Sequence, residues 1–304
     1  MRLLRFATVV TAVLISVTLS GQEKLTVEQV IANHLTSIGT PDARAAVKSR
    51  AAEGSSKFEN VNSGGSLEGK ATLVSQSNST RVIMKFPSPE YPGEDMIFNG
   101  DKIQVWGRPQ RSALGYMLYN QSSALLSDGL LEGTLSTAWP LLDPQLRSAK
   151  LTYEGLKTID GQQLHEVRYQ PKKKSDMDIR LYFSKDNYRH VLTIAKLTLA
   201  ARMVGNTSLA EVGEAGPAGS LTLGPGTAAG VGSPEVANAT QQEVRYRIEE
   251  RFSDFNTFDG LTLPTTCQIR YDMEGQRLAH QRYTLTISNV INNVSLDERT
   301  FQVK

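Results

Sequence analysis

The segment from Val244 to Ile287 constrains the fold more than any other, because its side chains alternate between apolar and polar. Tyr246 and Ile248 fall on one parity, and Arg247 and Glu249 fall on the other. Alternation with a period of two places successive side chains on opposite faces of a β-strand. The segment therefore predicts three consecutive antiparallel strands in a sheet with one buried face and one solvated face.

Turn residues mark the ends of these and further strands. Asp259-Gly260 and Glu274-Gly275 divide the C-terminal segment, and Asn99-Gly100 and Asp160-Gly161 divide two other pairs of apolar runs. Glycine and small polar residues adopt the positive φ of tight hairpin turns at little cost. Gly155 breaks the alternation within its run, which is typical of a β-bulge. Further strands are expected at residues 71–75, 82–86, 151–159, 164–169, 179–183 and 191–199.

Two regions favour helices. Thr26 and Gln29 have the spacing of a capping box at the start of an amphipathic run that ends at Gly39, and Pro41 begins a second short turn. Residues 112–146 are rich in leucine but lack strict alternation, and glycine and proline interrupt them. This pattern predicts one or two helices with irregular joints in the middle of the chain.

The first residues indicate export. Arg2 and Arg5 precede an apolar run over residues 6–19, and small residues follow at Ser20 and Gly21. This is the pattern of a secretory signal peptide, residues 1–21, whose cleavage would release a soluble periplasmic or secreted protein. A membrane anchor is the alternative, but the run is shorter than the ~20 apolar residues of a membrane span.

Charge excludes one class of partner. The leader carries two of the 33 basic residues and none of the 31 acidic ones, which leaves 33 − 2 = 31 basic against 31 acidic residues. A chain of zero formal charge lacks the basic footprint of a nucleic-acid-binding protein. We therefore expect no nucleic-acid partner.

Residues 204–240 consist largely of glycine, alanine, proline and serine. Such a composition buries too little apolar surface to offset the entropy of ordering. Strands of the same type are expected on both sides of the tract. We therefore interpret it as a flexible insertion in a hairpin loop of a single domain, residues 22–304, and not as a linker between two domains.

The sequence lacks the usual catalytic motifs. There is no G-x-S-x-G elbow, no H-E-x-x-H pair and no phosphate-binding glycine loop. Cys267 shares the parity of Leu263 and Ile269, which predicts a small buried side chain rather than a reactive thiol. We expect no enzymatic activity, no metal and no cofactor. A glycosidase pair of carboxylates stays open, because such residues come from anywhere in a chain.

The histidines follow no ligand spacing. His34 lies within the apolar stripe of the first helix, where packing or hydrogen bonding is the commoner role. His165 shares the parity of Val167, and His190 shares the parity of Leu192 and Ile194. Both are expected to be structural residues within strands.

Large apolar side chains are the positive evidence for a function. A curved sheet beside separate helices either has its concave face filled by the helices or encloses a cavity for an apolar ligand. Ordinary core packing is the alternative for every one of these residues. The candidate lining residues are Met84, Phe86, Met96, Phe98, Trp106, Trp139, Tyr153, Tyr246, Ile269 and Tyr271.

Three local motifs resemble a known family. They are the F-S-D-F-x-x-x-D-G-L-x-L-P pattern at Phe252–Pro264, the N-x-x-x-D-E-x-x-F tail at Asn293–Phe301, and the opening V-I-A-N-H-L-T-S-I-G at Val30–Gly39. Together with the order of elements, they resemble the LolA and LolB superfamily of periplasmic lipoprotein carriers and its outer-membrane lipoprotein-sorting relatives. The motifs mark turns and strand ends and identify no ligand.

The resemblance implies an α+β fold, an unclosed antiparallel β-barrel of about eleven strands wrapped over a few helices. In that superfamily the hollow beneath the helices holds acyl chains, and related domains bind partner proteins. We therefore expect a periplasmic carrier whose partners are a lipid or an acylated protein and a membrane-associated donor or acceptor protein. A protein-interaction or sensor domain without lipid cargo is the alternative.

Overall fold

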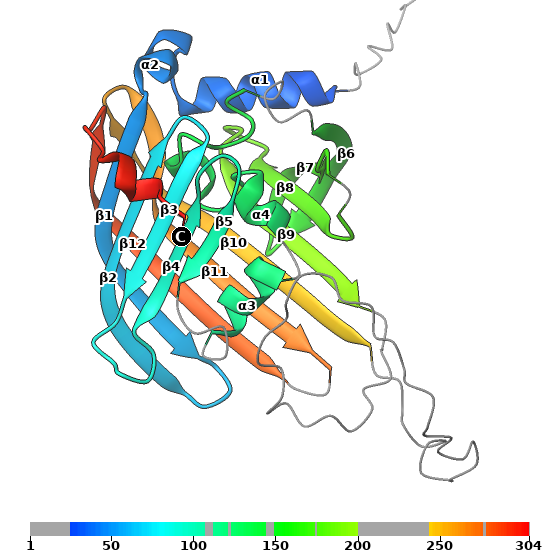
Figure 1. Cartoon of the computed structure of the whole chain (residues 1–304). Helices are drawn as coiled ribbons and strands as arrows, with labels where there is room; N and C mark the ends of the chain where they lie inside the picture. The colour runs from blue at the N-terminus through cyan, green and yellow to red at the C-terminus, as the bar shows by residue number, and fades with distance from the viewer. Residues whose placement is uncertain are drawn as a thin grey trace, which may run out of the picture.

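The computed structural model describes residues 25–106, 112–120, 123–143, 149–173, 175–199, 243–275 and 278–303. The strands in these ranges form one antiparallel sheet of twelve, in the order β5-β4-β3-β2-β1-β12-β11-β10-β9-β8-β7-β6. The sheet curves around the helices, and β5 and β6 form its two edges (Figure 1). The expected α+β, unclosed antiparallel architecture is confirmed, with twelve strands.

The strands range from four to fifteen residues in length. In chain order they are β1 (Ser49–Asn60), β2 (Gly65–Gln76), β3 (Ser79–Lys85), β4 (Gly93–Phe98), β5 (Ile103–Trp106), β6 (Lys150–Ile159), β7 (Gln162–Gln170), β8 (Asp178–Ser184), β9 (His190–Leu199), β10 (Val244–Phe258), β11 (Leu261–Glu274) and β12 (Ala279–Asn292).

The C-terminal strands follow the alternation in the sequence. β10 pairs with β11, and β11 pairs with β12, both antiparallel, which confirms the three strands expected there. Asp259 and Gly260 both have positive φ, 48° and 77°, as the turn between β10 and β11 requires. The register of β6 shifts between Tyr153 and Gly155, so the expected bulge is also confirmed.

Two predictions concern parts of the chain that lie outside the described residues. The signal peptide at residues 1–21 and the insertion at residues 204–240 are both in this category. β9 and β10, the strands on either side of the insertion, are hydrogen-bonded neighbours in the sheet. The insertion therefore connects adjacent strands of one sheet.

The helical segments lie on the concave side of the sheet, except the last 3₁₀ turn, whose Thr300 carbonyl accepts a hydrogen bond from Arg81 on the other side. They are α1 (Val27–Ile38), α2 (Pro41–Ala46), α3 (Ala113–Asn120) and α4 (Ser123–Ser127), with short 3₁₀ turns η1 (Gly133–Leu135) and η2 (Glu298–Phe301). Thr26 and Gln29 form the expected capping box of α1. α1 crosses one end of the sheet, and α3 lies near the opposite end (Figure 1). Among the described residues, no helix has the length and hydropathy to span a membrane.

We call the face of the sheet toward the helices its inner face. Side chains of this face form one apolar cluster with α1, α3, α4 and residues 130–141. A second, smaller cluster of Leu164, Tyr182, Leu192 and Ile194 lies on the outer face, as the pairing of Leu192 with Arg251 indicates. The molecule therefore has its main core inside the curve of the sheet.

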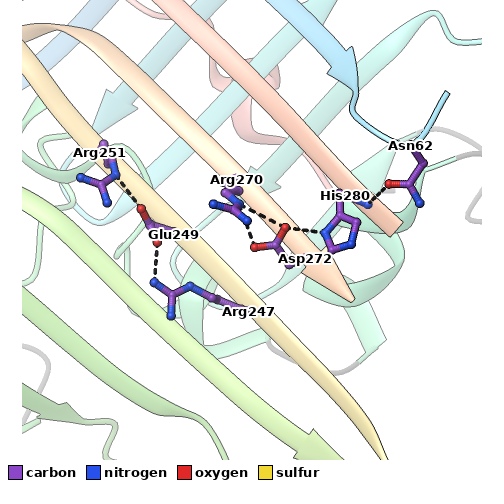
Figure 2. A network of polar contacts seen from close by, with 7 residues as sticks. All are labelled: Asn62, Arg247, Glu249, Arg251, Arg270, Asp272 and His280. Carbon is purple, nitrogen blue, oxygen red and sulfur yellow. Dashed lines mark hydrogen bonds and ion pairs between the residues drawn. The ribbon is translucent and has the colours of Figure 1, made fainter. Parts of the chain in front are cut away.

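Charged side chains occupy the outer face of β10, β11 and β12. Glu249 accepts hydrogen bonds of 2.5 Å from both Arg247 and Arg251 (Figure 2). On the neighbouring strands, Asp272 forms an ion pair with Arg270, and its carboxylate lies 2.8 Å from Nδ1 of His280 (Figure 2). The polar parity predicted from the sequence is therefore the solvated face of the sheet.

Candidate functional site

Eight of the ten candidate lining residues belong to the main apolar cluster or pack against it. Tyr153 and Tyr246 are half-buried against the main cluster, whereas Phe98 is buried outside it. Trp106 ends β5, and its side chain lies outside what the structure describes. The residues that are buried within the main cluster are Met84, Phe86, Met96, Trp139, Ile269 and Tyr271.

A buried segment between the helices and the sheet, residues 130–142, is here called the plug. Its backbone is held by the sheet: Arg50 of β1 donates hydrogen bonds to the carbonyls of Thr134 and Leu135, at 2.9 and 3.0 Å. Ser75 of β2 accepts a hydrogen bond from the amide of Thr137 at 2.9 Å. Burial lowers the pKa of Arg50 to about 10. These contacts fix irregular backbone that would otherwise be buried without partners.

A pair of buried glutamates fixes the start of the plug. Glu132 has a left-handed conformation, φ 68°, and its amide donates to Oε1 of Glu250 on β10 at 2.8 Å. Thr80 of β3 donates to the Glu132 carboxylate at 3.0 Å, and the Cys267 thiol donates to Glu250 at 3.3 Å. Burial raises the pKa of Glu250 to about 7, and burial together with the neighbouring Glu250 raises that of Glu132.

The end of the plug is fixed to α1. Trp139 Nε1–H donates to Nε2 of His34 at 3.1 Å, and Nδ1 of His34 lies 3.1 Å from the carbonyl of Tyr188. An indole nitrogen only donates and a carbonyl only accepts, so His34 is neutral with its proton on Nδ1. Burial lowers the pKa of His34 to about 4. His34 is therefore a packed, hydrogen-bonded residue, as expected.

The predicted parity of His190 is wrong. His190 stacks on Trp139 inside the molecule, with ring centroids 4.6 Å apart, whereas Leu192 and Ile194 lie on the outer face. The register between β8 and β9 shifts after Tyr182, which pairs with Leu192 while the next residue pairs with His190. The extra residue reverses the direction of every side chain before it.

The helices α3 and α4 are here called the flap. Their contacts with the sheet are made by buried apolar side chains, which are Leu114, Met117, Leu118, Leu125 and Leu126. A hydrogen-bonded carboxylate lies at each end of the flap. Ser112, before α3, donates to Glu94 of β4, and Asp128, after α4, accepts from the hydroxyl of Tyr169 on β7 at 2.9 Å. The flap therefore differs from the plug, which polar contacts hold along its length.

The Glu94 carboxylate lies on the inner face beneath the start of α3. Its Oε1 accepts a hydrogen bond from the Tyr91 hydroxyl at 2.5 Å, and the Tyr283 hydroxyl lies 3.4 Å away. Its Oε2 is buried without a hydrogen-bond partner. Burial raises the pKa of Glu94, and the hydrogen bonds from Ser112, Tyr91 and Tyr283 oppose that rise.

Three cavities bounded by described residues lie elsewhere, on the outer side of the sheet between β6 and β11. Two of about 450 and 440 Å³ share Leu164, Val191 and Phe255 near the hairpin ends, and residues including Glu166 and Arg180 line a third of about 270 Å³. The residues that line these three cavities include none of the ten candidates.

No protein-family model matches the sequence, and no curated protein matches it. Among solved structures, the chain is similar to a LolA superfamily protein from Nitrosomonas europaea, with 13% identity, a TM-score of 0.47, and 92% of this chain and 98% of that chain covered. An outer membrane lipoprotein-sorting protein domain from Vibrio parahaemolyticus is 10% identical, with a TM-score of 0.43 and coverages of 90% and 96%.

A DUF1329 family protein from Desulfovibrio piger is also similar, at 10% identity and a TM-score of 0.43, over 91% of this chain and 97% of that chain. Two of these neighbours, the LolA superfamily protein and the lipoprotein-sorting domain, carry the names of the family that the sequence motifs resemble. At these identities the similarity concerns the fold alone.

The alternation of the strands does not reveal the buried polar residues of the inner face. Glu250 lies between Ile248 and Phe252 on the apolar parity of β10, and Glu94 has the parity of Met96 on β4. A carboxylate at an apolar position of the alternation is the sequence signal for such a residue. An ionisable side chain is seldom buried without a specific partner, so it indicates a polar contact inside the molecule.

Proposed function

We propose that the protein binds an apolar chain, such as the acyl chain of a lipid or lipoprotein, on the inner face of the sheet in the space that the flap occupies. The single observation that carries this proposal is the contrast between plug and flap. Polar contacts hold the plug along its length, whereas apolar side chains pack the helices of the flap against the sheet.

An apolar ligand can replace the flap at low cost. The leucines and the methionine of the flap are buried in the same apolar cluster as Met84, Met96 and Tyr271 of the sheet. An acyl chain in the place of the flap would bury the same kind of surface. Each methylene that leaves water contributes ~0.8 kcal/mol, so a chain of about ten carbons offsets the loss of several flap contacts. Displacing the plug would instead leave Arg50, Glu250 and His34 buried without their partners. Each unsatisfied neutral group costs about 1–3 kcal/mol of stability, and a charged group costs more.

Location and partners follow from the leader and the cargo. The signal-peptide pattern at residues 1–21 supports export to the periplasm, with residues 22–304 acting as one binding domain. A carrier for a water-insoluble chain needs a membrane-associated donor and acceptor. We therefore include such proteins, together with the lipid or acylated protein, among the partners, and assign no catalytic step.

Two methionine variants test the proposal. Met84 on β3 and Met117 on α3 are both fully buried in the main cluster, so their replacement by alanine costs a similar ~2–5 kcal/mol of stability. Met84→Ala removes part of the surface that the ligand would contact and weakens binding of dodecanol. Met117→Ala weakens the packing of the flap that competes with the ligand, and therefore strengthens binding. Titration calorimetry measures both affinities.

The opposite signs distinguish binding under the flap from loss of stability. If both variants weaken dodecanol binding to the same extent, the ligand does not replace the flap. If native mass spectrometry and calorimetry detect no dodecanol or lipid on the wild-type protein, the carrier proposal fails.

The close packing of the interior favours a second candidate, a protein-interaction or sensor domain. Met84, Met96 and Trp139 are at most 1% exposed, as expected of a filled core. In that case the protein would bind a partner protein through its outer surface. A stable partner in a pull-down, together with no alkyl binding, would favour this second function.

A further inference from the structure

The carboxylate of Glu94 lies among hydroxyl groups at a position where the polar end of a ligand could bind. The three hydroxyls of Tyr91, Ser112 and Tyr283 surround one oxygen of this carboxylate. The side chains come from the β3–β4 connection, from the residue before α3, and from β12. They satisfy Oε1 and leave Oε2 free.

The free oxygen lies in a place where an unmade hydrogen bond is costly. Glu94 is 2% exposed, and its Oε2 is buried without a partner. In the described part of the chain, no lysine, arginine or histidine forms an ion pair with Glu94. Most buried carboxylates are paired with a cation or fully hydrogen-bonded. Glu94 Oε2 therefore lacks a hydrogen-bond donor, and a positively charged donor would also offset the charge of the buried carboxylate.

The structure also shows what covers this oxygen. A Cβ added to Gly115 of α3 would lie 3.1 Å from Glu94 Oε2 and 3.1 Å from Val105, so the glycine lets the flap pass close to the carboxylate. α3 lies near the end of the sheet opposite α1 (Figure 1). A ligand that displaces α3 would uncover Oε2 at that end, with the apolar cluster extending inward from it.

We propose that Glu94, flanked by Tyr91 and Tyr283, binds a protonated primary amine at the polar end of the apolar chain. This inference rests on the proposed function and names the class of its ligand. The ammonium N–H donates to Oε2 and supplies the missing positive charge. Charge-assisted hydrogen bonds of this kind are about twice as strong as neutral ones.

The same geometry disfavours anionic ligands. A carboxylate or phosphate head group placed beside Glu94 would add a second negative charge at a buried position, where like charges repel strongly. Burial already raises the pKa of Glu94. A neighbouring ammonium would lower that pKa again, whereas an anion would raise it further.

Four ligands with the same twelve-carbon chain test the inference on the full protein. They are dodecylamine, dodecyltrimethylammonium, dodecanol and dodecanoate, each titrated calorimetrically at neutral pH below its micelle concentration. Dodecylamine should bind at least about tenfold tighter than dodecyltrimethylammonium, which has the charge but no N–H donor. It should also bind at least about tenfold tighter than dodecanol, and dodecanoate should bind weakest.

Two variants assign the preference to Glu94. Glu94→Gln keeps the size of the side chain and removes its charge, and the preference for the amine over dodecanol should disappear. Glu90→Gln makes the same change at an exposed residue nearby and should leave the preference intact. Circular dichroism and thermal unfolding check that both variants fold, and the wild-type ligand series remains decisive if Glu94→Gln does not fold.

The outcomes separate this inference from the proposed function. If all four ligands bind wild-type protein equally, or dodecanoate binds best, the amine preference is wrong while the proposed function stands. A preference for dodecylamine that persists in Glu94→Gln also overturns it. If none of the four ligands binds, the proposed function itself fails.

Discussion

The indole nitrogen of Trp139 donates a hydrogen bond of 3.1 Å to Nε2 of His34, joining the plug to α1 across 105 positions of sequence. Because Nδ1 of His34 faces the carbonyl of Tyr188, both ring nitrogens are engaged and the ring is neutral. Protonation of Nε2 would break the contact with Trp139 and place a charge in the core. The attachment of the plug to α1 therefore depends on pH.

His34 should make the protein less stable in mild acid. Its pKa is about 4 in the folded protein and 6.5 as an ordinary value, so between these pH values the unfolded chain binds a proton that the folded protein does not. The free energy of unfolding therefore falls as pH falls from 6.5 to 4, by roughly 3 kcal/mol at most. His34→Gln does not titrate, and its stability relative to wild type should improve over this range in urea unfolding. Parallel pH profiles would contradict the assignment.

Glu250 should act in the opposite direction. Its pKa is about 7 in the folded protein against an ordinary 4.5, so in this window the folded protein holds a proton that the unfolded chain has released. The free energy of unfolding falls as pH rises from 4.5 to 7 and stays lower above it, by roughly 2–3 kcal/mol. Glu250→Gln should be more stable than wild type at pH above 7 and lose this advantage towards pH 4.5. A variant less stable at every pH would refute a buried charge at this position.

Alanine substitutions at two glycines distinguish the cost of a strained backbone from the cost of a steric clash. Gly133 of the plug and Gly161 of the β6–β7 turn have positive φ, 52° and 79°. Alanine at either position would adopt this left-handed conformation at a cost of about 1–2 kcal/mol of stability. A Cβ at Gly133 would lie 2.8 Å from the Phe252 ring, whereas none of the atoms considered lies within 4 Å of a Cβ at Gly161.

Gly133→Ala should therefore destabilise the protein by about 1–3 kcal/mol more than Gly161→Ala. Urea unfolding of both variants measures the difference. Equal losses would mean that the plug shifts easily, contrary to the polar contacts that hold it.

Local patterns predicted the sheet well where one face is apolar and the other charged. β10, β11 and β12 follow such alternation. Asp259 and Gly260 form the turn between β10 and β11, which requires positive φ at both residues. β1 was not predicted as a defined strand. Its sequence, Ser49–Asn60, is rich in serine and alanine, and its place between β2 and β12 depends on pairing with residues more than 200 positions away.

The candidate site was less predictable, because its polar contacts join distant parts of the chain. Arg50 reaches carbonyls 84 and 85 positions away, and Glu250 reaches an amide 118 positions away. No local pattern encodes such pairs. The bulge before Leu192 likewise reversed the direction of His190, which the alternation alone placed on the other face.

Hydrogen exchange with and without dodecanol is the most direct test of the central claim, that an apolar chain replaces the flap while the plug stays in place. On binding, amides of α3 and α4 should exchange faster as the helices leave the sheet, while those of residues 130–142 keep their protection. Unchanged exchange in α3 and α4 at saturating dodecanol, or loss of protection in the plug instead, would contradict the account.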